Sequence, residues 1–291
     1  MWIIFFHTDF IGREKNGKNK LEIDYARTNY DIDLQIMDVQ KFQIKLLNNK
    51  LELFYDNKLI TNYPNYVFMK AFDNNLGHFF NSKGINYNNN IVWSMISEDK
   101  MATHIYLAEL GIKMPDTIYC SSKNSEDYSY DDLTNKFGPK FILKATHGTQ
   151  GANVHLVDSE KQFYELLKKY NFNCIFQEFI ASSFGKDVRA TIIDGKCVTT
   201  SLRESKDDFR SNMALGGKPK PYKVDKKLEK LAEQIAKKMN LWICGIDFLI
   251  GKDDEYYVCE VNCVPSFKVS EKLNYFHIID LIAIENKKGG N

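Results

Sequence analysis

Two strand-like segments near the end of the chain place the strongest constraint on its fold. Residues 245–250 and 256–262 are rich in β-branched and aromatic side chains, a composition typical of strands. Gly251 and the three polar residues after it form a turn between them. A four-residue loop predicts an antiparallel hairpin in which Ile250 pairs with Glu255.

Three oxygen-bearing side chains share one face of this predicted hairpin. In that register Asp247 lies opposite Val258, so Glu260, two residues farther along, shares its face, as does Asn262. Two carboxylates and an amide oxygen form a site of hard oxygen ligands, the kind that Mg²⁺ uses. From this segment alone, charges at the rim of an ordinary hairpin remain an equal alternative.

Composition narrows the class of protein. The 291 residues include 39 basic and 38 acidic side chains, a net charge of +1, which gives no general attraction to nucleic acid or to an anionic membrane. The apolar start, residues 1–6, lacks a basic flank, so we expect no signal peptide. No run approaches eighteen consecutive apolar residues, so we expect no membrane span. The six cysteines contain no C-x-x-C pair, which indicates reduced core thiols in a cytoplasmic protein and no zinc site.

The fold class predicted from the order of elements is α/β (α+β). A strand at 2–7, a polar loop at 13–20, a helix at 21–30 and a strand at 32–39 predict a small parallel-sheet domain over residues 1–95. The rest of this domain is expected to hold a hairpin (42–46 and 51–55), a strand (66–70) and a helix (73–83).

The remainder of the chain is predicted to form two further subdomains, 96–180 and 181–291. Ser97 is predicted as the N-cap of a helix to residue 110, and Asp194-Gly195 is the strongest hairpin signal in the chain. Other expected elements are strands at 117–120, 140–145, 174–180, 187–193 and 196–202, helices at 159–170, 224–239 and 266–285, and a loop at 121–130.

Several polar features between these elements suit a nucleotide, although each has an ordinary structural explanation. The loop Gly148-Thr149-Gln150-Gly151 joins two strands, which argues against a P-loop or a dinucleotide fingerprint, because both need a helix N-terminus. Its backbone N–H groups could still meet phosphate beside Lys144, or it is a plain hairpin turn. Gln177-Glu178 interrupts an apolar strand and could meet an adenine edge, or it marks an edge strand.

A basic segment precedes the proposed metal ligands. Arg203, Lys206 and Arg210 lie within eight residues of one another, and guanidinium groups suit phosphate. A solvated loop remains the alternative.

The order of these features resembles the ATP-grasp superfamily, and more closely its RimK branch, whose name-giver adds glutamate to a ribosomal protein. The resemblance covers roughly residues 95–285. It implies two α/β subdomains that grip ATP, preceded by a small parallel-sheet domain. The residues that carry it are Lys100, Lys144, the glycine loop, Gln177-Glu178, Asp187-Val188-Arg189, Phe209-Arg210-Ser211-Asn212, Asp247 and Glu260-Val261-Asn262.

The resemblance also implies a role for each residue. Lys100 and Lys144 would contact the ATP phosphates. The loop Gly148-Thr149-Gln150-Gly151 would close over these phosphates as a lid. The adenine hinge would be formed by Gln177, Glu178, Phe179 and Ile180, and Asp187 would lie by the ribose. Arg189, Arg210 and Asn212 would face the transferred phosphate and the acyl group, and Arg203 is counted among the nucleotide contacts. Asp247, Glu260 and Asn262 would hold two Mg²⁺ ions, with Mn²⁺ as an alternative.

The implied activity is an ATP-dependent carboxylate–amine ligase that acts through an acyl phosphate. Metal ions and arginines suit the negative charge that develops in such a reaction, and no side-chain nucleophile is required. The substrates would be an amino acid, a small acid, a peptide or a protein, with neither membrane nor nucleic acid involved. An ATP-grasp kinase and a non-catalytic ATP-binding module remain alternative functions. Assembly as a homo-oligomer also remains open.

Overall fold

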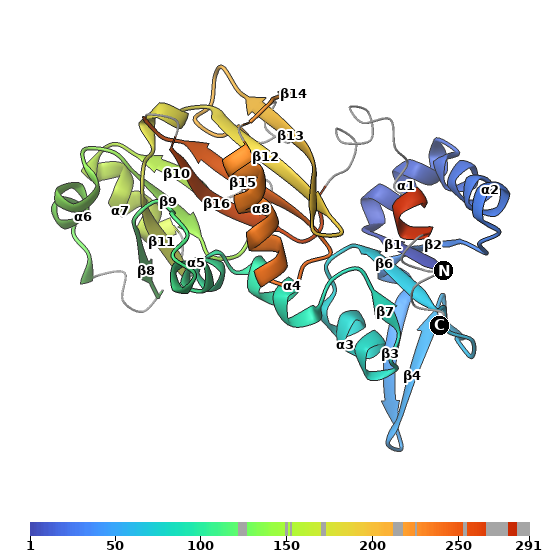
Figure 1. Ribbon diagram of the computed structural model, residues 1–291. Coiled ribbons are helices and arrows are strands. Elements are labelled where there is room, and N and C mark those ends of the chain that lie inside the picture. Colours follow the sequence, from blue (N-terminus) through green and yellow to red (C-terminus); the bar gives the residue numbers. More distant parts are fainter. Residues whose placement is uncertain are drawn as a thin grey trace. The chain divides into compact units, whose positions relative to one another are not determined.

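The chain divides by its own contacts into two compact units (Figure 1). Unit 1 comprises Met1–Trp93, Asn240–Ile243 and Val264–Asn291, and unit 2 comprises Ser94–Met239 and Cys244–Cys263. The computed structural model describes residues 1–121, 127–148, 151, 153–169, 173–211, 218–224, 226–252, 255–265 and 279–283. The predicted subdomain boundaries at residues 95 and 180 stay predictions.

Unit 1 is built on a parallel sheet of four strands in the order β2-β1-β6-β7. Its segment 13–20, predicted as a loop, is largely helical, so that prediction is wrong. Two helices meet at Gly17, whose φ is 66°. Each helix buries a single residue, Phe10 in the first and Ala26 in the second, so the sequence shows little of the apolar periodicity from which a helix is predicted. The elements are β1 (Trp2–Phe5), α1 (His7–Lys15), α2 (Lys18–Tyr30), β2 (Gln35–Asp38), η1 (Val39–Lys41), β6 (Tyr66–Lys70), α3 (Asn74–Ser82) and β7 (Asn86–Tyr87).

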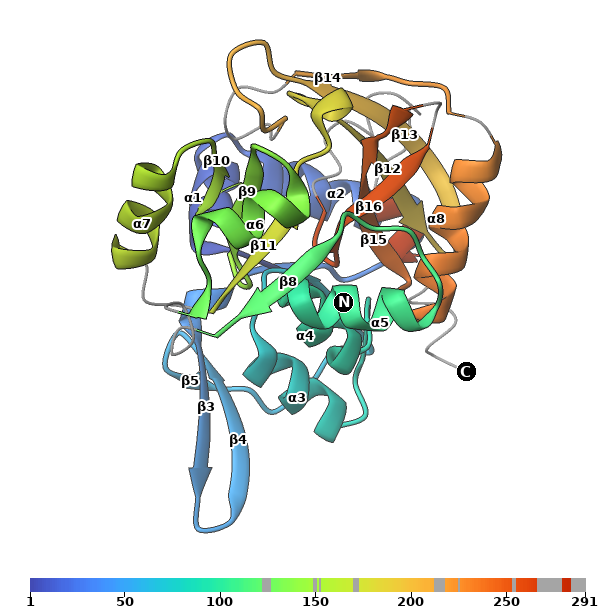
Figure 2. The ribbon, with the colours of Figure 1, turned by 90° about the vertical axis from the view of Figure 1, so that its left-hand side faces the viewer.

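A second, antiparallel sheet of unit 1 extends as a long ribbon (Figure 2). It consists of β3 (Phe42–Leu47), β4 (Lys50–Tyr55) and the short β5 (Lys58–Leu59). Asn48 and Asn49 both have positive φ, 50° and 62°, as a two-residue hairpin turn requires. The predicted hairpin is therefore confirmed.

Unit 2 contains an antiparallel sheet with two different faces, in the order β10-β9-β11-β8. One face packs Phe141 and Phe176 against Leu133 and Phe163 of two covering helices. Side chains alternate along a strand, so Ile142, Lys144 and Gln177 lie on the other face. The elements are β8 (Thr117–Cys120), α6 (Tyr130–Phe137), β9 (Phe141–Ala145), β10 (Val154–Val157), α7 (Glu160–Lys169), β11 (Cys174–Glu178) and η3 (Ala181–Ser183).

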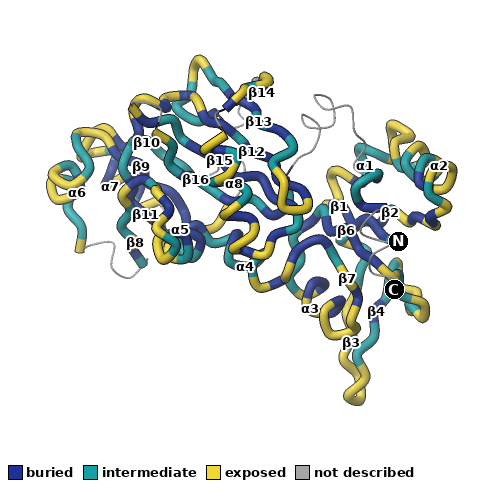
Figure 3. The backbone as a smooth tube through the Cα atoms, in the orientation of Figure 1, coloured by how far each residue is buried: buried dark blue, intermediate teal, exposed yellow. Residues whose placement is uncertain are grey.

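A five-stranded sheet in the order β14-β13-β12-β15-β16 forms the second half of unit 2. Asp194 and Gly195 have φ of 49° and 71°, which confirms the predicted hairpin. The helix over this sheet buries Leu228, Ala232 and Ile235, and Figure 3 shows the buried strands beneath it. The elements are β12 (Lys186–Ile193), β13 (Lys196–Glu204), β14 (Lys218–Pro221), α8 (Lys226–Lys238), β15 (Ile243–Ile250) and β16 (Tyr256–Asn262).

The helix predicted to start at Ser97 starts later. A separate helix, α4 (Ile91–Glu98), precedes α5 (Lys100–Glu109). The N-cap is Asp99, whose carboxylate accepts from the backbone N–H of residues 101 and 102 at 2.8 and 3.0 Å. Residues 279–283 are helical, and the rest of the helix predicted at 266–285 lies outside the described residues. None of the described helices combines the length and apolar character that crossing a membrane requires.

Candidate active site

The hairpin β15–β16 differs in register from the prediction. Its loop holds five residues, not four, and a β-bulge follows: Phe248 pairs with Val258, but Asp247 pairs with Glu260. Cys259 is the extra residue. In an unbroken ladder Asp247 would face Cys259, and Glu260 would lie on the opposite side of the sheet. The predicted pairs are wrong, and the bulge is what places Asp247 and Glu260 on one face.

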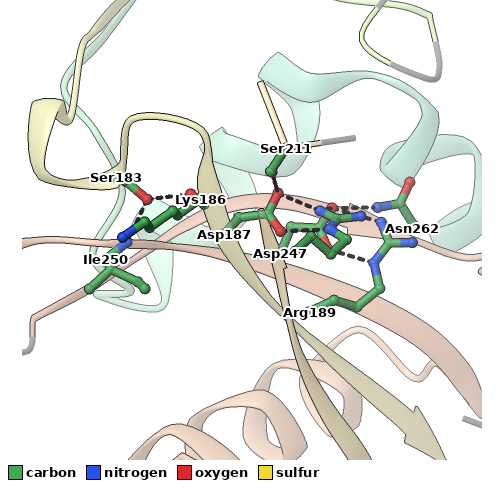
Figure 4. A network of polar contacts seen from close by, with 9 residues as sticks. Ser183, Lys186, Asp187, Arg189, Ser211, Asp247, Ile250 and Asn262 are labelled. Carbon is green, nitrogen blue, oxygen red and sulfur yellow. Dashed lines mark hydrogen bonds and ion pairs between the residues drawn. The ribbon is translucent and has the colours of Figure 1, made fainter. Parts of the chain in front are cut away.

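A closed network of two arginines and two aspartates lies on strands β12, β13 and β15 (Figure 4). Arg189 binds Asp247 through two hydrogen bonds, Nε to Oδ1 at 2.6 Å and Nη2 to Oδ2 at 2.7 Å. Arg203 donates from Nε and Nη2 to the Asp187 carboxylate at 2.6 and 2.5 Å. Nη2 of Arg203 also lies 2.8 Å from Asp247 Oδ2. One guanidinium therefore joins both carboxylates.

Strand register explains why these four residues meet. Asp187 lies directly opposite Arg203 in the β12–β13 pair, and opposite residues share a face. Arg189 is two positions from Asp187 on the same strand and so points to the same side. β15 is the next strand of the sheet and contributes Asp247.

Three of the four members of this network are buried. Arg203, Asp247 and Asp187 are 4%, 3% and 7% exposed. Burial raises the pKa of Asp187 against the opposing effect of Arg203, whereas Arg189 and Arg203 outweigh burial and hold the pKa of Asp247 below its ordinary value. Buried charges of this kind depend on their partners, so we read Arg203 as an internal tether that leaves few donors for a phosphate.

Two residues extend the network. Ser211 donates its hydroxyl hydrogen to Asp187 Oδ2, and Asn262 donates from Nδ2 to Asp247 Oδ2 at 3.4 Å. Ser211 is among the residues that carry the family resemblance, but the sequence predicts no role for it in the site.

A second group of cations contacts backbone carbonyls at the two ends of the glycine loop. Lys100 donates from Nζ to the Gly148 carbonyl at 2.8 Å and lies 3.9 Å from Glu260 Oε1. Burial lowers the pKa of Lys100, and Glu260 opposes that shift. Arg210 donates from Nη1 to the Gly151 carbonyl at 2.9 Å.

Asp208, which the sequence did not single out, orients Arg210. It accepts from Nε and Nη2 of Arg210 at 3.0 and 2.7 Å. Lys206, from the same basic segment, is exposed and does not line the pocket described next.

Several of these side chains, including Lys100, Arg210 and Glu260, line a pocket in unit 2. Its walls include the polar face of the β10-β9-β11-β8 sheet, and apolar groups from Leu249 and Phe179 face it. Of the predicted site residues it brings together Lys100, Lys144, Gly148, Gly151, Gln177, Glu178, Phe179, Ile180, Asp187, Arg210 and Glu260. Arg189, Arg203, Asp247 and Asn262 lie in the network joined to Asp187 rather than in the pocket lining. Thr149, Gln150 and Asn212 lie outside the described residues.

The predicted magnesium ligands fit that metal by their chemistry. Asp247, Glu260 and Asn262 offer hard oxygen donors from one sheet face. Within the described part of the chain no three His, Cys, Asp or Glu residues gather as a ready-made metal site. Guanidinium groups hold both Asp247 oxygens. A metal would therefore exchange with some of those contacts.

Comparisons with known proteins give the family. Residues 97–283 match a sequence family described as RimK-like ATP-grasp domain. An uncharacterized protein of Mycoplasma genitalium is 27% identical over 85% of this chain and 86% of its own length. A probable alpha-L-glutamate ligase of Legionella pneumophila is 34% identical over 60% of this chain, and the match spans 58% of that ligase.

A solved structure shares the fold along nearly the whole chain. The ATP-grasp ligase PsnB, complexed with a minimal precursor, Mg and ADP, superposes with a TM-score of 0.70 at 15% identity. The match covers 100% of this chain and 97% of PsnB. At that identity the likeness establishes the fold alone.

Proposed function

The chain belongs to the RimK-like ATP-grasp family, and from that premise we propose that it is an ATP-dependent ligase that joins a carboxylate to an amine. The observation that carries the proposal is the pocket of unit 2. Lys100, Lys144 and Arg210 line it together with apolar groups and Gln177. Cations beside an apolar slot match a nucleotide, which has phosphates at one end and a flat base at the other.

The reaction proceeds in two steps. A carboxylate oxygen attacks the terminal phosphorus of ATP, the bond to ADP breaks, and an acyl phosphate forms. The amine then attacks the acyl carbon, the C–N bond forms, phosphate leaves, and the nitrogen loses a proton to solvent or base. Lys100, Lys144 and Arg210 stabilise the negative charge on the transferred group, because preformed charges in a shielded site oppose charge that develops there.

Magnesium fits the same pocket edge. Glu260, Asn262 and Asp247 would hold it, two ions being the number that the family resemblance implies. When bound, Mg²⁺ neutralises phosphate charge during transfer. Arg189 and Arg203 keep Asp247 oriented until then.

For the substrates, we propose L-glutamate as the amine and the carboxylate of a peptide or protein as the acid. The Legionella relative is named a probable alpha-L-glutamate ligase, and PsnB is described in complex with a precursor.

The six cysteines are free thiols, which fits the cytoplasmic setting predicted above.

A direct assay tests this function. Purified protein is incubated with ATP, Mg²⁺, L-glutamate and a peptide library, and phosphate release is followed with mass analysis of the products. We expect a peptide heavier by one glutamate residue, and with hydroxylamine in place of glutamate a peptide hydroxamate. A stable phosphorylated product would favour the kinase, and ATP binding without any turnover would favour the non-catalytic module.

A further inference from the structure

The side chain of Gln177 is fixed in one orientation beside the pocket. We propose that Thr117 sets this orientation so that Gln177 presents an acceptor oxygen to the base, which selects a purine with a 6-amino group over one with a 6-oxo group. The inference rests on the proposed nucleotide site and adds to it a specificity-determining pair, of which Thr117 acts only by positioning Gln177.

The strand register places the two side chains together. Gln177 of β11 lies directly opposite Thr117 of β8 on one side and opposite Ile142 of β9 on the other. Residues opposite one another share a face, and Ile142 and Gln177 both line the pocket. Gln177 is only 2% exposed, so its amide cannot rely on bulk water.

The direction of each hydrogen bond follows from the carbonyl of Pro115. That oxygen can only accept, and Thr117 Oγ1 lies 2.8 Å from it. The single hydroxyl hydrogen of Thr117 is thereby used, so the hydroxyl must accept from its other neighbour. That neighbour is the amide of Gln177, whose Nε2 lies 2.7 Å away. The NH₂ group of Gln177 therefore faces Thr117, and its Oε1 faces away.

A nearby histidine does not disturb this arrangement. His104 Nδ1 lies 3.4 Å from Thr117 Oγ1, and its Nε2 lies 3.4 Å from the Cys259 carbonyl. Burial, with Lys144 adding to it, lowers the pKa of His104 to about 3. The ring is thus neutral at ordinary pH, and the closer Pro115 carbonyl keeps the hydroxyl hydrogen.

The remaining amide oxygen determines which base is accepted. Within the described part of the chain, Gln177 Oε1 has no hydrogen-bond partner, and its side chain lines the pocket beside Ile142 and Phe179. The amino group of adenine can donate to this oxygen. The oxo group of hypoxanthine would bring two acceptors together and leave both unsatisfied in a shielded site.

Binding of ATP and inosine triphosphate tests the inference. The two bases differ at the 6-substituent and at N1, which carries a hydrogen only in the 6-oxo base, so the variants below are needed to assign the difference to Gln177. Dissociation constants are measured by calorimetry with Mg²⁺ and without an acid substrate, so turnover is not needed. For the unmodified protein we expect ATP to bind at least ~10-fold more tightly, as expected when a buried acceptor is left unpaired. In Thr117→Val the amide is free to rotate, and the ratio should fall to within about 3-fold of unity, less than the cost of a lost pairing.

Matched variants separate positioning from general damage. Thr103 is also buried and donates its hydroxyl hydrogen to a carbonyl, that of Ile96 at 2.8 Å, so Thr103→Val should keep the ratio. Thr117→Ser should restore it, and Gln177→Met, which has neither donor nor acceptor, should abolish it even if Thr117→Val fails to fold.

The outcomes are distinct. An unchanged ratio in Gln177→Met, or in folded Thr117→Val, overturns the inference while leaving the nucleotide site intact. Equal binding of both nucleotides by the unmodified protein also overturns it. If neither nucleotide binds at all, the proposed function itself fails.

Discussion

Two charged regions of unit 2 lie close together but hold their charges differently. The Arg203 network pairs buried side chains with buried side chains, and Arg203 and Asp247 are almost fully enclosed. At the glycine loop, Lys100 and Arg210 each pair with one carboxylate and also donate to a backbone carbonyl, and the side chain of Arg210 is 25% exposed. A carbonyl carries only a partial charge, so a phosphate could displace it more easily than it could displace a carboxylate.

The difference suggests a division of labour. The closed network keeps strands β12, β13 and β15 in fixed orientation, whereas the cations at the loop remain available to a ligand. Substitutions in the first region should therefore lower stability, in addition to any effect on Mg²⁺, whereas those in the second should lower catalysis with little effect on stability. Four measurements test that separation.

Asp247→Ala should have the largest effect, and on stability. It leaves the buried Arg203 and the partly buried Arg189 without one of their partners. Removing one partner of a buried ion pair typically costs about 3–5 kcal/mol of unfolding free energy. Urea denaturation followed by circular dichroism would measure it. Asp208→Ala, which removes a carboxylate that also binds an arginine through two hydrogen bonds but is partly exposed, is the matched control and should cost far less. Equal losses in the two variants would remove the distinction between the regions.

Arg210→Ala should act on catalysis rather than on folding. If Arg210 stabilises charge in the transition state, kcat should fall by a factor equivalent to about 3–4 kcal/mol, as for the loss of one oxyanion donor. Its unfolding free energy should change by less than about 1 kcal/mol, because the Asp208 pair is partly exposed. Steady-state kinetics on a variant of normal stability would establish this. An unchanged kcat would mean that Arg210 only binds the glycine loop through the Gly151 carbonyl and has no role in catalysis.

Glu260 lies between the two regions, because it pairs with Lys100 and shares a sheet face with Asp247. The substitution Glu260→Gln therefore tests both. We expect the variant to fold and its turnover to fall roughly 100-fold, the upper end for changes around a metal site. Glu255→Gln is the control, because Glu255 belongs to the same hairpin but pairs with exposed Lys113. Near-normal activity of Glu260→Gln at saturating Mg²⁺ would remove Glu260 from the site.

The smallest effect concerns pH. Hydrogen bonds from Arg210 lower the pKa of Asp208 below its ordinary value of 3.8. The unfolded chain therefore takes up the proton first, and the stabilisation present at neutral pH is lost as the pH falls below that value. For a partly exposed pair we expect no more than about 0.5 kcal/mol. Other carboxylates with a lowered pKa, such as Glu204 and Glu255, lose their stabilisation in acid in both proteins. Urea titrations at several acidic pH values should therefore show a loss that is larger in the unmodified protein than in Asp208→Asn; a loss of the same size in both would refute the prediction.

Local signals in the sequence predicted much of the fold. The Asp194-Gly195 turn and the Asn48-Asn49 turn specify their hairpins because few residues adopt positive φ readily. The N-cap of α5 was assigned to Ser97 instead of Asp99, since both residues can cap a helix and only the preceding helix α4 decides between them. Helix α6 was missed because just one of its residues, Leu133, is buried.

The candidate site was predictable in residue type but not in arrangement. Charge and order along the chain pointed to Arg203 and Asp247, yet nothing in the sequence states that Arg203 is spent on two carboxylates. That depends on the pairing of β12 with β13 and on the position of β15 in the sheet. Such contacts join residues up to 58 positions apart, beyond the reach of local patterns.

The bulge at Cys259 shifts the register in which β16 pairs with β15 by one residue. Upstream of Cys259 the strand matches β15 in one phase, and downstream it matches in the other. If Cys259 were paired with Asp247 in an unbroken ladder, every downstream side chain would remain in the protein, but Glu260 and Asn262 would turn to the other side of the sheet. Any alignment or redesign of this hairpin must therefore keep the position of the extra residue. Composition alone does not show on which face of the sheet Glu260 and Asn262 lie.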